Sequence, residues 1–120
     1  MNIYCEGSIG KLPIKLRALS TPKEWARGYQ HQKLAPTHGE GLLFIFNEES
    51  PRRFHMKNVT FDLDLLAFDS NGKLVFRVPM KANAKISYKT PACQFIVEVP
   101  SGWASSLKLG ESLLRVRKVF

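Results

Sequence analysis

Apolar and polar positions alternate along much of the chain, and a period of two residues is typical of half-buried β-strands. The clearest case covers residues 73–89, where every even position from 74 to 88 is apolar or aromatic. A helix would scatter these side chains around its circumference, whereas a strand places them on one face. Pro79 and Asn83 interrupt the run and therefore predict two strands or a bulged, bent ribbon.

Other segments show the same alternation or a continuous apolar run. Residues 41–46 are apolar throughout, which predicts a strand buried on both faces. Asn71-Gly72 predicts a tight turn that joins two strands into a hairpin. The predicted strands span residues 12–18, 41–46, 62–68, 73–78, 93–99 and 113–119.

Helix signals are few. Residues 21–24 place Thr at the N-cap, Pro at the first helical position and Glu at the third, which is the start of a capping box. This helix would carry Trp25 and end near Gly28, and a second short helix is expected over residues 101–107, ending at Gly110. Six or seven strands with one or two short helices predict a mainly β protein, a small β-sandwich or partly open barrel.

Length and composition indicate a globular chain. The 120 residues predict a single β-rich domain over residues 1–120, and the apolar fraction of 44% is enough for a packed core. The longest apolar run, over residues 42–46, is far shorter than a membrane-spanning helix requires. The first residues lack the basic start and apolar stretch of a secretory signal, so the expected location is the cytoplasm, unless a leader has been removed.

An ordered set of short motifs resembles an uncharacterised prokaryotic family catalogued as domain of unknown function 192. The resemblance extends over about residues 19–113 and implies a jelly-roll-like β domain without an established activity. Because such proteins also occur in phages, it further implies a virion or phage accessory protein as one concrete form. The motifs are Arg27-Gly28, Gly41-Leu42-Leu43-Phe44-Ile45-Phe46, Phe54-His55-Met56-Lys57-Asn58, Leu63-Asp64, Val97-Glu98-Val99-Pro100-Ser101-Gly102-Trp103-Ala104 and Leu109-Gly110.

His55, Lys57, Asn58 and Asp64 form the densest polar cluster of the sequence, beside the two arginines 52–53. In one interpretation, Lys57 and Asn58 face an anion or a sugar, and a buried Lys–Asp pair performs acid–base chemistry. In the other, which we prefer, Asn58 satisfies backbone groups at a turn and Asp64 pairs with Lys57. A small-ligand-binding protein or enzyme with a pocket at this cluster is therefore the alternative function.

No metal, cofactor or catalytic residue is predicted. His31, His38 and His55 lack the close spacing of a zinc site, and Cys5 and Cys93 lie far apart in the sequence. Neither a glycine-rich phosphate loop nor a Gly-x-Ser-x-Gly elbow occurs.

The charge suggests a docking surface. The 18 Lys and Arg residues against 10 Asp and Glu residues give a net charge of +8. The candidate basic face consists of Lys11, Lys15, Arg17, Lys73, Arg77, Lys81, Lys85 and Lys89. It would bind an acidic protein surface or a polyanion, and the open alternative is a solvated sheet face.

The preferred function is a non-catalytic binding or assembly module that docks an acidic partner, within a viral assembly if the phage resemblance applies. The chain would then be cytoplasmic or virion-associated. The predicted basic face has few outward aromatic residues and the sequence has no recognition-helix pattern, so sequence-specific nucleic-acid binding is not expected.

Overall fold

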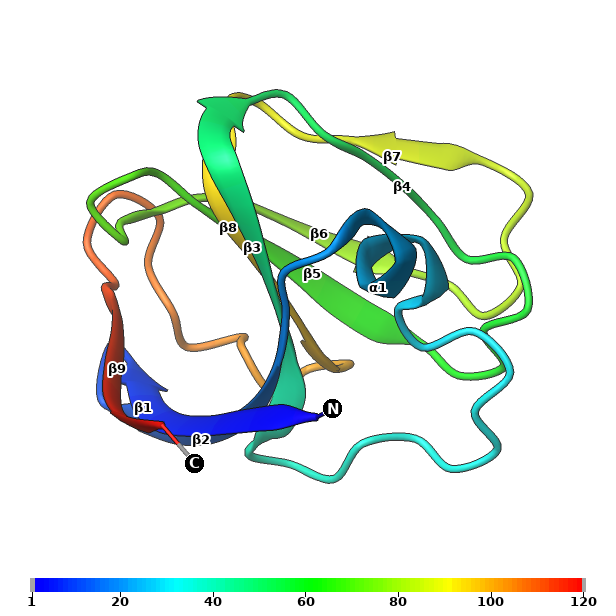
Figure 1. Ribbon diagram of the computed structural model, residues 1–120, viewed down its shortest axis with the longest axis horizontal. Coiled ribbons are helices and arrows are strands. Elements are labelled where there is room, and N and C mark those ends of the chain that lie inside the picture. The colour runs from blue at the N-terminus through cyan, green and yellow to red at the C-terminus, as the bar shows by residue number, and fades with distance from the viewer. Residues whose placement is uncertain (1, 120) are drawn as a thin grey trace.

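A computed structural model describes residues 2–119, which form nine strands and one short helix (Figure 1). The strands are β1 (Ile3–Ile9), β2 (Leu12–Leu19), β3 (Glu40–Ser50), β4 (Arg53–His55), β5 (Leu63–Phe68), β6 (Leu74–Met80), β7 (Ser87–Lys89), β8 (Cys93–Pro100) and β9 (Leu114–Val119). The helix α1 (Pro22–Arg27) lies between β2 and β3 in the sequence.

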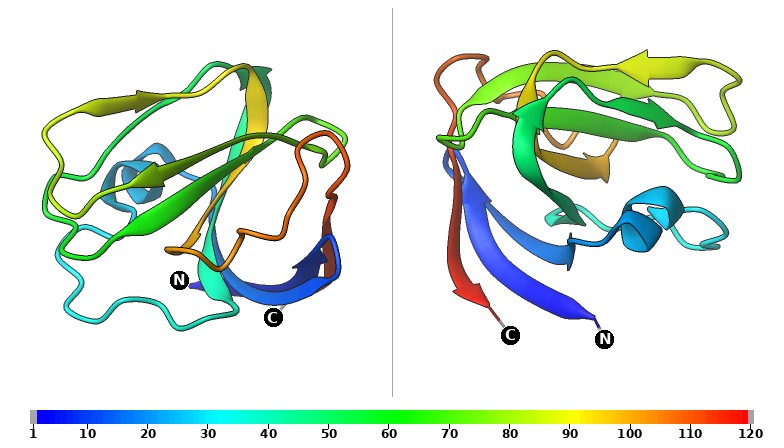
Figure 2. Two further views of the ribbon diagram at one scale, coloured as in Figure 1. Left: turned by 180° about the vertical axis from the view of Figure 1, so that it is seen from behind. Right: turned by 45° about the horizontal axis from the view of Figure 1, so that its top comes forward.

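Seven strands form one mixed sheet in the order β6-β5-β8-β3-β2-β1-β9, and β4 and β7 form a separate two-stranded sheet. The β2–β3 pair is parallel, whereas the other neighbours are antiparallel. The large sheet curls strongly, and a single bridge between Lys73 and Leu113 connects its two edges (Figure 2). The predicted mainly β fold is confirmed, and the barrel is open rather than closed.

Two clusters of buried apolar side chains occupy the two sides of the large sheet. One contains Phe44, Leu65 and Met80, and side chains of α1 and β4 pack against it. The other includes Leu66 and Phe68. Because β5 contributes to both clusters, all six of its residues are buried, including Asp64.

The six strands predicted from the sequence correspond to β2, β3, β5, β6, β8 and β9. The predicted hairpin turn at Asn71-Gly72 is also present, and the Asp69 side chain accepts hydrogen bonds from the N–H groups of Asn71 and Lys73. The sequence prediction missed β1 and β4. In β1, a glycine and a cysteine occupy buried positions, so its alternation is weak in the sequence.

The two strands or bulged ribbon predicted over residues 73–89 are present, as β6 with a bulge and then β7. A bulge opposite Ala67 and Phe68 places Leu74 in one core cluster and Phe76 against the other. The chain then turns at residues 81–86, where Asn83 has a positive φ of 53°, and continues as β7 in the separate sheet. Phe76, Val78, Met80, Ala84 and Tyr88 all contact the same core cluster, whereas Leu74 lies in the other and Ile86 is exposed. The cations between them are divided among the β5–β6 hairpin, the turn after β6 and β7.

The capping box at the start of α1 is confirmed, and the helix ends at Gly28 as predicted. The second helix is wrong, because residues 101–107 form consecutive turns. Gly102 has a φ of 85°, in the left-handed region that interrupts a right-handed helix. Its N–H donates a hydrogen bond of 2.9 Å to the carboxylate of Asp64, which holds this turn against β5.

Candidate functional site

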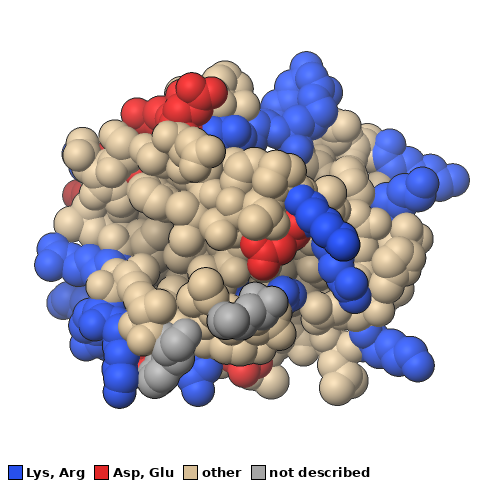
Figure 3. Space-filling model, viewed as in Figure 1, with Lys and Arg blue, Asp and Glu red and all other residues tan. Residues whose placement is uncertain are grey.

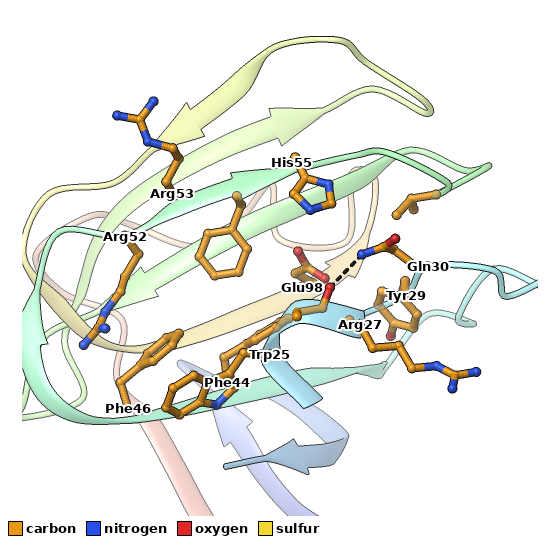
Figure 4. Close-up of a pocket in the computed structure, with 14 residues that line it drawn as sticks. Trp25, Arg27, Tyr29, Gln30, Phe44, Phe46, Arg52, Arg53, His55 and Glu98 are labelled. Carbon is orange, nitrogen blue, oxygen red and sulfur yellow. Dashed lines mark hydrogen bonds between the residues drawn. The ribbon is translucent and has the colours of Figure 1, made fainter. Parts of the chain in front are cut away.

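A cavity of about 230 Å³ opens between α1 and β4, with β3 and β8 forming its floor (Figure 4). Its lining combines five Trp, Tyr and Phe side chains with one carboxyl and several cationic groups. The lining residues are Trp25, Ala26, Arg27, Gly28, Tyr29, Gln30, Phe44, Phe46, Arg52, Arg53, Phe54, His55, Val59 and Glu98.

The helix that forms one wall is fixed at both ends. At its start, the Glu24 side chain accepts hydrogen bonds from the N–H groups of Ser20 and Thr21. The indole N–H of Trp25 donates to the Leu19 carbonyl at 3.0 Å, which ties the helix to the end of β2. At its end, Gly28 has a φ of 47°, and a Cβ atom there would lie 3.5 Å from Phe44. The helix terminus therefore lies directly over the cavity floor.

The aromatic walls are in mutual contact. The rings of Phe44 and Phe46 are nearly parallel, with centroids 6.5 Å apart, and Phe54 meets Phe44 edge-on at 5.2 Å. Trp25 packs against Phe46 with a centroid distance of 4.7 Å. The guanidinium carbon of Arg52 lies 3.9 Å from the centre of the Phe46 ring, so a cation already stacks on this wall.

Glu98 places a carboxyl group on the cavity floor. It belongs to β8 and lies opposite Leu42 and Leu65 in the neighbouring strands. Only 5% of its surface is exposed, and within residues 2–119 its side chain makes no hydrogen bond or ion pair. Burial raises the pKa of this carboxyl to about 8. Buried carboxyl groups nearly always have partners, so this one requires an explanation.

Arg52, which also lines the cavity, contains an unsatisfied donor of its own. Its Nη2 donates to the Glu48 carbonyl at 2.5 Å, but its buried Nε–H has no hydrogen-bond acceptor among the described residues. This N–H has almost no accessible surface and does not open onto the cavity, whereas Glu98 lines the cavity without a partner among the described residues.

Polar and charged groups surround the aromatic part of the cavity. Figure 4 shows Glu98 in the centre, with the guanidinium groups of Arg27, Arg52 and Arg53 directed to the periphery. Gln30 is held by a hydrogen bond of 2.6 Å from its Nε2 to the carbonyl of Ala26. The cavity is thus acidic at its floor and basic at its rim.

The predicted polar cluster is only partly assembled. His55, Lys57 and Asn58 line a second hollow together with residues 83–87. His55 also lines the cavity between α1 and β4. The N–H of Lys57 donates to His55 Nδ1 at 3.2 Å. Asp64 lies apart, because its carboxylate binds the Gly102 N–H, and the expected Lys57–Asp64 pair does not form within residues 2–119.

The predicted basic residues are distributed over several elements. Lys11, Lys15 and Arg17 belong to the β1–β2 hairpin, Lys73 and Arg77 to the β5–β6 hairpin, Lys81 and Lys85 to the turn after β6, and Lys89 to β7. Lys81 pairs with Asp62 at 3.7 Å. Arg77 is half-buried, and its Nη1 donates to the carbonyls of Ala104 and Leu107 at 2.8 and 2.7 Å. Figure 3 accordingly shows separate groups of cations around this view.

Arg77 is expected to stabilise the fold rather than to bind a partner. Arg77→Met removes the donor for two carbonyl groups, and hydrogen bonds to charged groups contribute about 1.5–3 kcal/mol each. We therefore expect a loss of about 3 kcal/mol in the free energy of unfolding, the lower end of the range for two such bonds, measured by urea denaturation. The exposed Lys85→Met is the matched control and should change this free energy by less than about 0.5 kcal/mol. Equal stability of the two variants would contradict the structural role.

Glu98 and Arg52 were not singled out as site residues from the sequence. A signal for Glu98 does exist, because it is an acid inside the apolar run of residues 95–99. No local pattern identifies Arg52 as a cavity residue, since its neighbours in the cavity come from α1, β3 and β8.

In the described part of the chain, no group of three His, Cys, Asp or Glu side chains could hold a metal ion. Cys5 and Cys93 are buried free thiols, and burial raises the pKa of both. The one helix within residues 2–119 lacks the length and apolarity needed to cross a membrane.

Comparisons with known proteins identify the fold and a family. The model of the family DUF192, described as "Uncharacterized ACR", matches residues 6–113. A crystal structure of a proposed transcription regulator from Sinorhizobium meliloti 1021 superposes with a TM-score of 0.86 at 18% identity, covering 95% of this chain and 93% of that one. A protein of unknown function from Novosphingobium aromaticivorans DSM 12444 gives 0.82 at 17% identity, covering 96% and 84%. No curated protein matches the chain.

Proposed function

The chain belongs to the DUF192 family, and we propose that it is a small-molecule-binding protein whose ligand occupies the cavity between α1 and β4. The observation that carries this proposal is Glu98, a nearly fully buried carboxyl that lines an aromatic cavity and has no partner within residues 2–119. Concave, mainly apolar cavities with a few convergent polar groups are the usual form of ligand sites.

The energetic cost of Glu98 favours a ligand over a purely structural role. A buried polar group without a hydrogen bond destabilises the fold, and a well-packed apolar residue at this position would avoid that cost. A bound molecule with a hydrogen-bond donor would satisfy the carboxyl. Within residues 2–119, no second titratable group is hydrogen-bonded to Glu98, whereas catalytic nucleophiles and bases usually work in such pairs. We therefore propose binding rather than catalysis.

The basic residues give weaker support to the docking of an acidic partner or to a role in a phage particle. Arg77 and Lys81 are engaged within the chain, and β6 and β7 belong to different sheets. The aromatic cavity is the more specific feature.

The proposal is tested by titrating the protein with benzyl alcohol, a neutral single-ring probe, and following the Trp25 indole N–H by NMR. We expect weak, saturable shifts of this signal, because Trp25 lines the cavity. Gly28→Val should abolish them, since its side chain would project toward Phe44 and Glu98.

Gly110→Val is the matched control, because Gly110 also has a positive φ, of 79°, but an added Cβ would meet no atom within 4 Å. Phe54→Ala, which removes one wall, provides a second variant should Gly28→Val fold poorly. Shifts that persist in Gly28→Val and Phe54→Ala as strongly as in Gly110→Val would refute binding in this cavity.

A further inference from the structure

The carboxyl group of Glu98 lines the cavity without a protein partner. Only 5% of the residue is exposed, and its side chain makes no hydrogen bond or ion pair within residues 2–119. A Cβ atom at Gly28 would lie 3.9 Å from its Oε1 atom and 3.5 Å from the Phe44 ring. The glycine therefore leaves open a space that borders both the carboxyl group and an aromatic wall.

The surroundings of Glu98 favour the neutral form of its carboxyl group. Its neighbours in β3 and β5 are Leu42 and Leu65, which carry no charge. The guanidinium groups of the cavity are directed to the periphery (Figure 4), and none forms an ion pair with Glu98 within residues 2–119. The charged and titratable groups that line the cavity with it are Arg27, Tyr29, Arg52, Arg53 and His55.

Burial without a cationic partner disfavours a carboxylate, and it raises the pKa of Glu98 to about 8. At neutral pH the side chain is therefore mainly a carboxylic acid. Such a group places an O–H donor and an acceptor oxygen side by side. A ligand that satisfies both must carry an acceptor and a donor on neighbouring atoms.

We propose that the cavity binds a small planar lactam, whose adjacent N–H and C=O groups pair with the two oxygens of Glu98. This inference rests on the proposed function and specifies its ligand class. The ligand N–H donates to the carbonyl oxygen of the acid, and the acid O–H donates to the carbonyl oxygen of the ligand. One neutral group thus satisfies both polar atoms of the buried side chain.

Other polar groups fit this site less well. An amine or amidine would pair with the carboxylate form, which burial disfavours, and it would have to pass the exposed guanidinium groups of Arg27 and Arg53. A carboxylate ligand would accept the O–H of Glu98 but would leave its second oxygen without a donor. The lactam alone among these groups is neutral and complementary to both oxygens.

The walls and the size of the cavity describe the body of the ligand. Phe44, Phe46 and Phe54 form a contiguous aromatic surface, which favours a flat ring. The volume of about 230 Å³ is smaller than the roughly 300–1,000 Å³ of sites for drug-sized molecules. A single six-membered ring is therefore a suitable probe.

Two isomers test the pairing, because they differ only in where the carbonyl group stands. The N–H and C=O groups of 2-pyridone lie on adjacent ring atoms, whereas those of 4-pyridone lie at opposite ends of the ring and cannot both reach one carboxyl. Calorimetry at about pH 7 compares the two affinities, and the Trp25 indole signal in NMR reports binding in the cavity. We expect 2-pyridone to bind about tenfold more tightly, the ratio that one additional hydrogen bond would give.

This preference is expected to depend on pH. Ionisation of Glu98 removes the O–H donor, whereas both pyridones stay uncharged between about pH 7 and about pH 9.5. The tenfold preference at about pH 7 should therefore fall below about twofold at about pH 9.5, as the pH rises through the pKa of Glu98. Calorimetry at both pH values measures the change.

Two substitutions of Glu98 identify the group that is responsible. Glutamine also presents a donor and an acceptor side by side but does not titrate, so Glu98→Gln should keep the preference at both pH values. Glu98→Met keeps a similar length without these groups and should bind the two isomers equally. Glu111→Gln, which changes an exposed acid outside the cavity, is the matched control and should behave as the wild type.

The outcomes separate the two proposals. If benzyl alcohol binds in the cavity but 2-pyridone binds no more tightly than 4-pyridone, the lactam is wrong while the small-molecule function stands. A preference for 2-pyridone that survives in Glu98→Met also overturns the pairing. Tighter binding of benzamidine than of 2-pyridone does so too, because its cation would select the carboxylate. If no probe perturbs Trp25, the proposed function itself fails.

Discussion

Replacing Glu98 with glutamine is expected to stabilise the protein at pH 8.5 by about 4 kcal/mol and to change its stability by less than about 1 kcal/mol at pH 5. Burial raises the pKa of Glu98 from 4.5 to about 8, so the folded state binds more protons than the unfolded state between these values. Its contribution to stability is therefore greatest below pH 4.5 and decreases as the pH rises to about 8. Each unit of difference in pKa corresponds to about 1.4 kcal/mol, and glutamine has no charge to desolvate.

Urea denaturation of both proteins at pH values from 5 to 9 measures this difference. The other charged or titratable groups that line the cavity are Arg27, Tyr29, Arg52, Arg53 and His55, and they are present in both proteins, so subtraction removes most of their titration. The exposed Glu111→Gln serves as the control and should show a flat difference. A stability difference between Glu98→Gln and the wild type that stays constant with pH would show that Glu98 is not a buried, unpaired acid.

This pH dependence connects stability to the proposed function. Selection for ligand binding can retain a residue that destabilises the folded protein, although an apolar residue at the same position would be more stable. A hydrogen-bond donor of the ligand would satisfy the Glu98 carboxyl and offset part of the cost of its burial. The Glu98→Gln protein should accordingly be more stable at pH 8.5.

Much of the fold could be predicted from the sequence because its signals are local. The alternation in β2 and β6, the Asn71-Gly72 turn and the capping box of α1 each depend on residues within a few positions of one another. The second helix predicted from the sequence does not form, because the structure of this segment depends on a contact with a distant residue. Gly102 takes a left-handed conformation, and its N–H binds Asp64, a residue 38 positions away.

The candidate site could not be predicted in the same way. Its walls combine Trp25, Phe44, Phe54 and Glu98, which come from four elements. Their proximity depends on the order of strands in the sheet, in which β8 pairs with β3 although a long segment separates them. The polar cluster that stood out in the sequence lies mainly at the neighbouring hollow, and His55 is the residue shared by both.

Gly41→Ala is expected to disturb the contact between β3 and β8, which places Glu98 on the cavity floor. A Cβ atom at Gly41 would lie 2.4 Å from the backbone oxygen of Glu98 and 3.2 Å from the Val99 side chain. Side-chain rotation cannot relieve a clash with backbone, so the two strands must separate. We expect a loss of about 3 kcal/mol in the free energy of unfolding, together with weaker binding of benzyl alcohol in the cavity.

Gly110→Ala separates this clash from ordinary backbone strain. Gly110 has a φ of 79°, but an added Cβ would meet no atom within 4 Å, whereas Gly41 lacks a positive φ and has only the clash. Left-handed backbone at a non-glycine residue costs about 1–2 kcal/mol, so Gly110→Ala should lose less stability and keep full ligand affinity. Urea denaturation and calorimetry of both variants measure these quantities. Because the ligand contacts depend on the position of β8, a Gly41→Ala protein with unchanged affinity would mean that the strand spacing does not position Glu98.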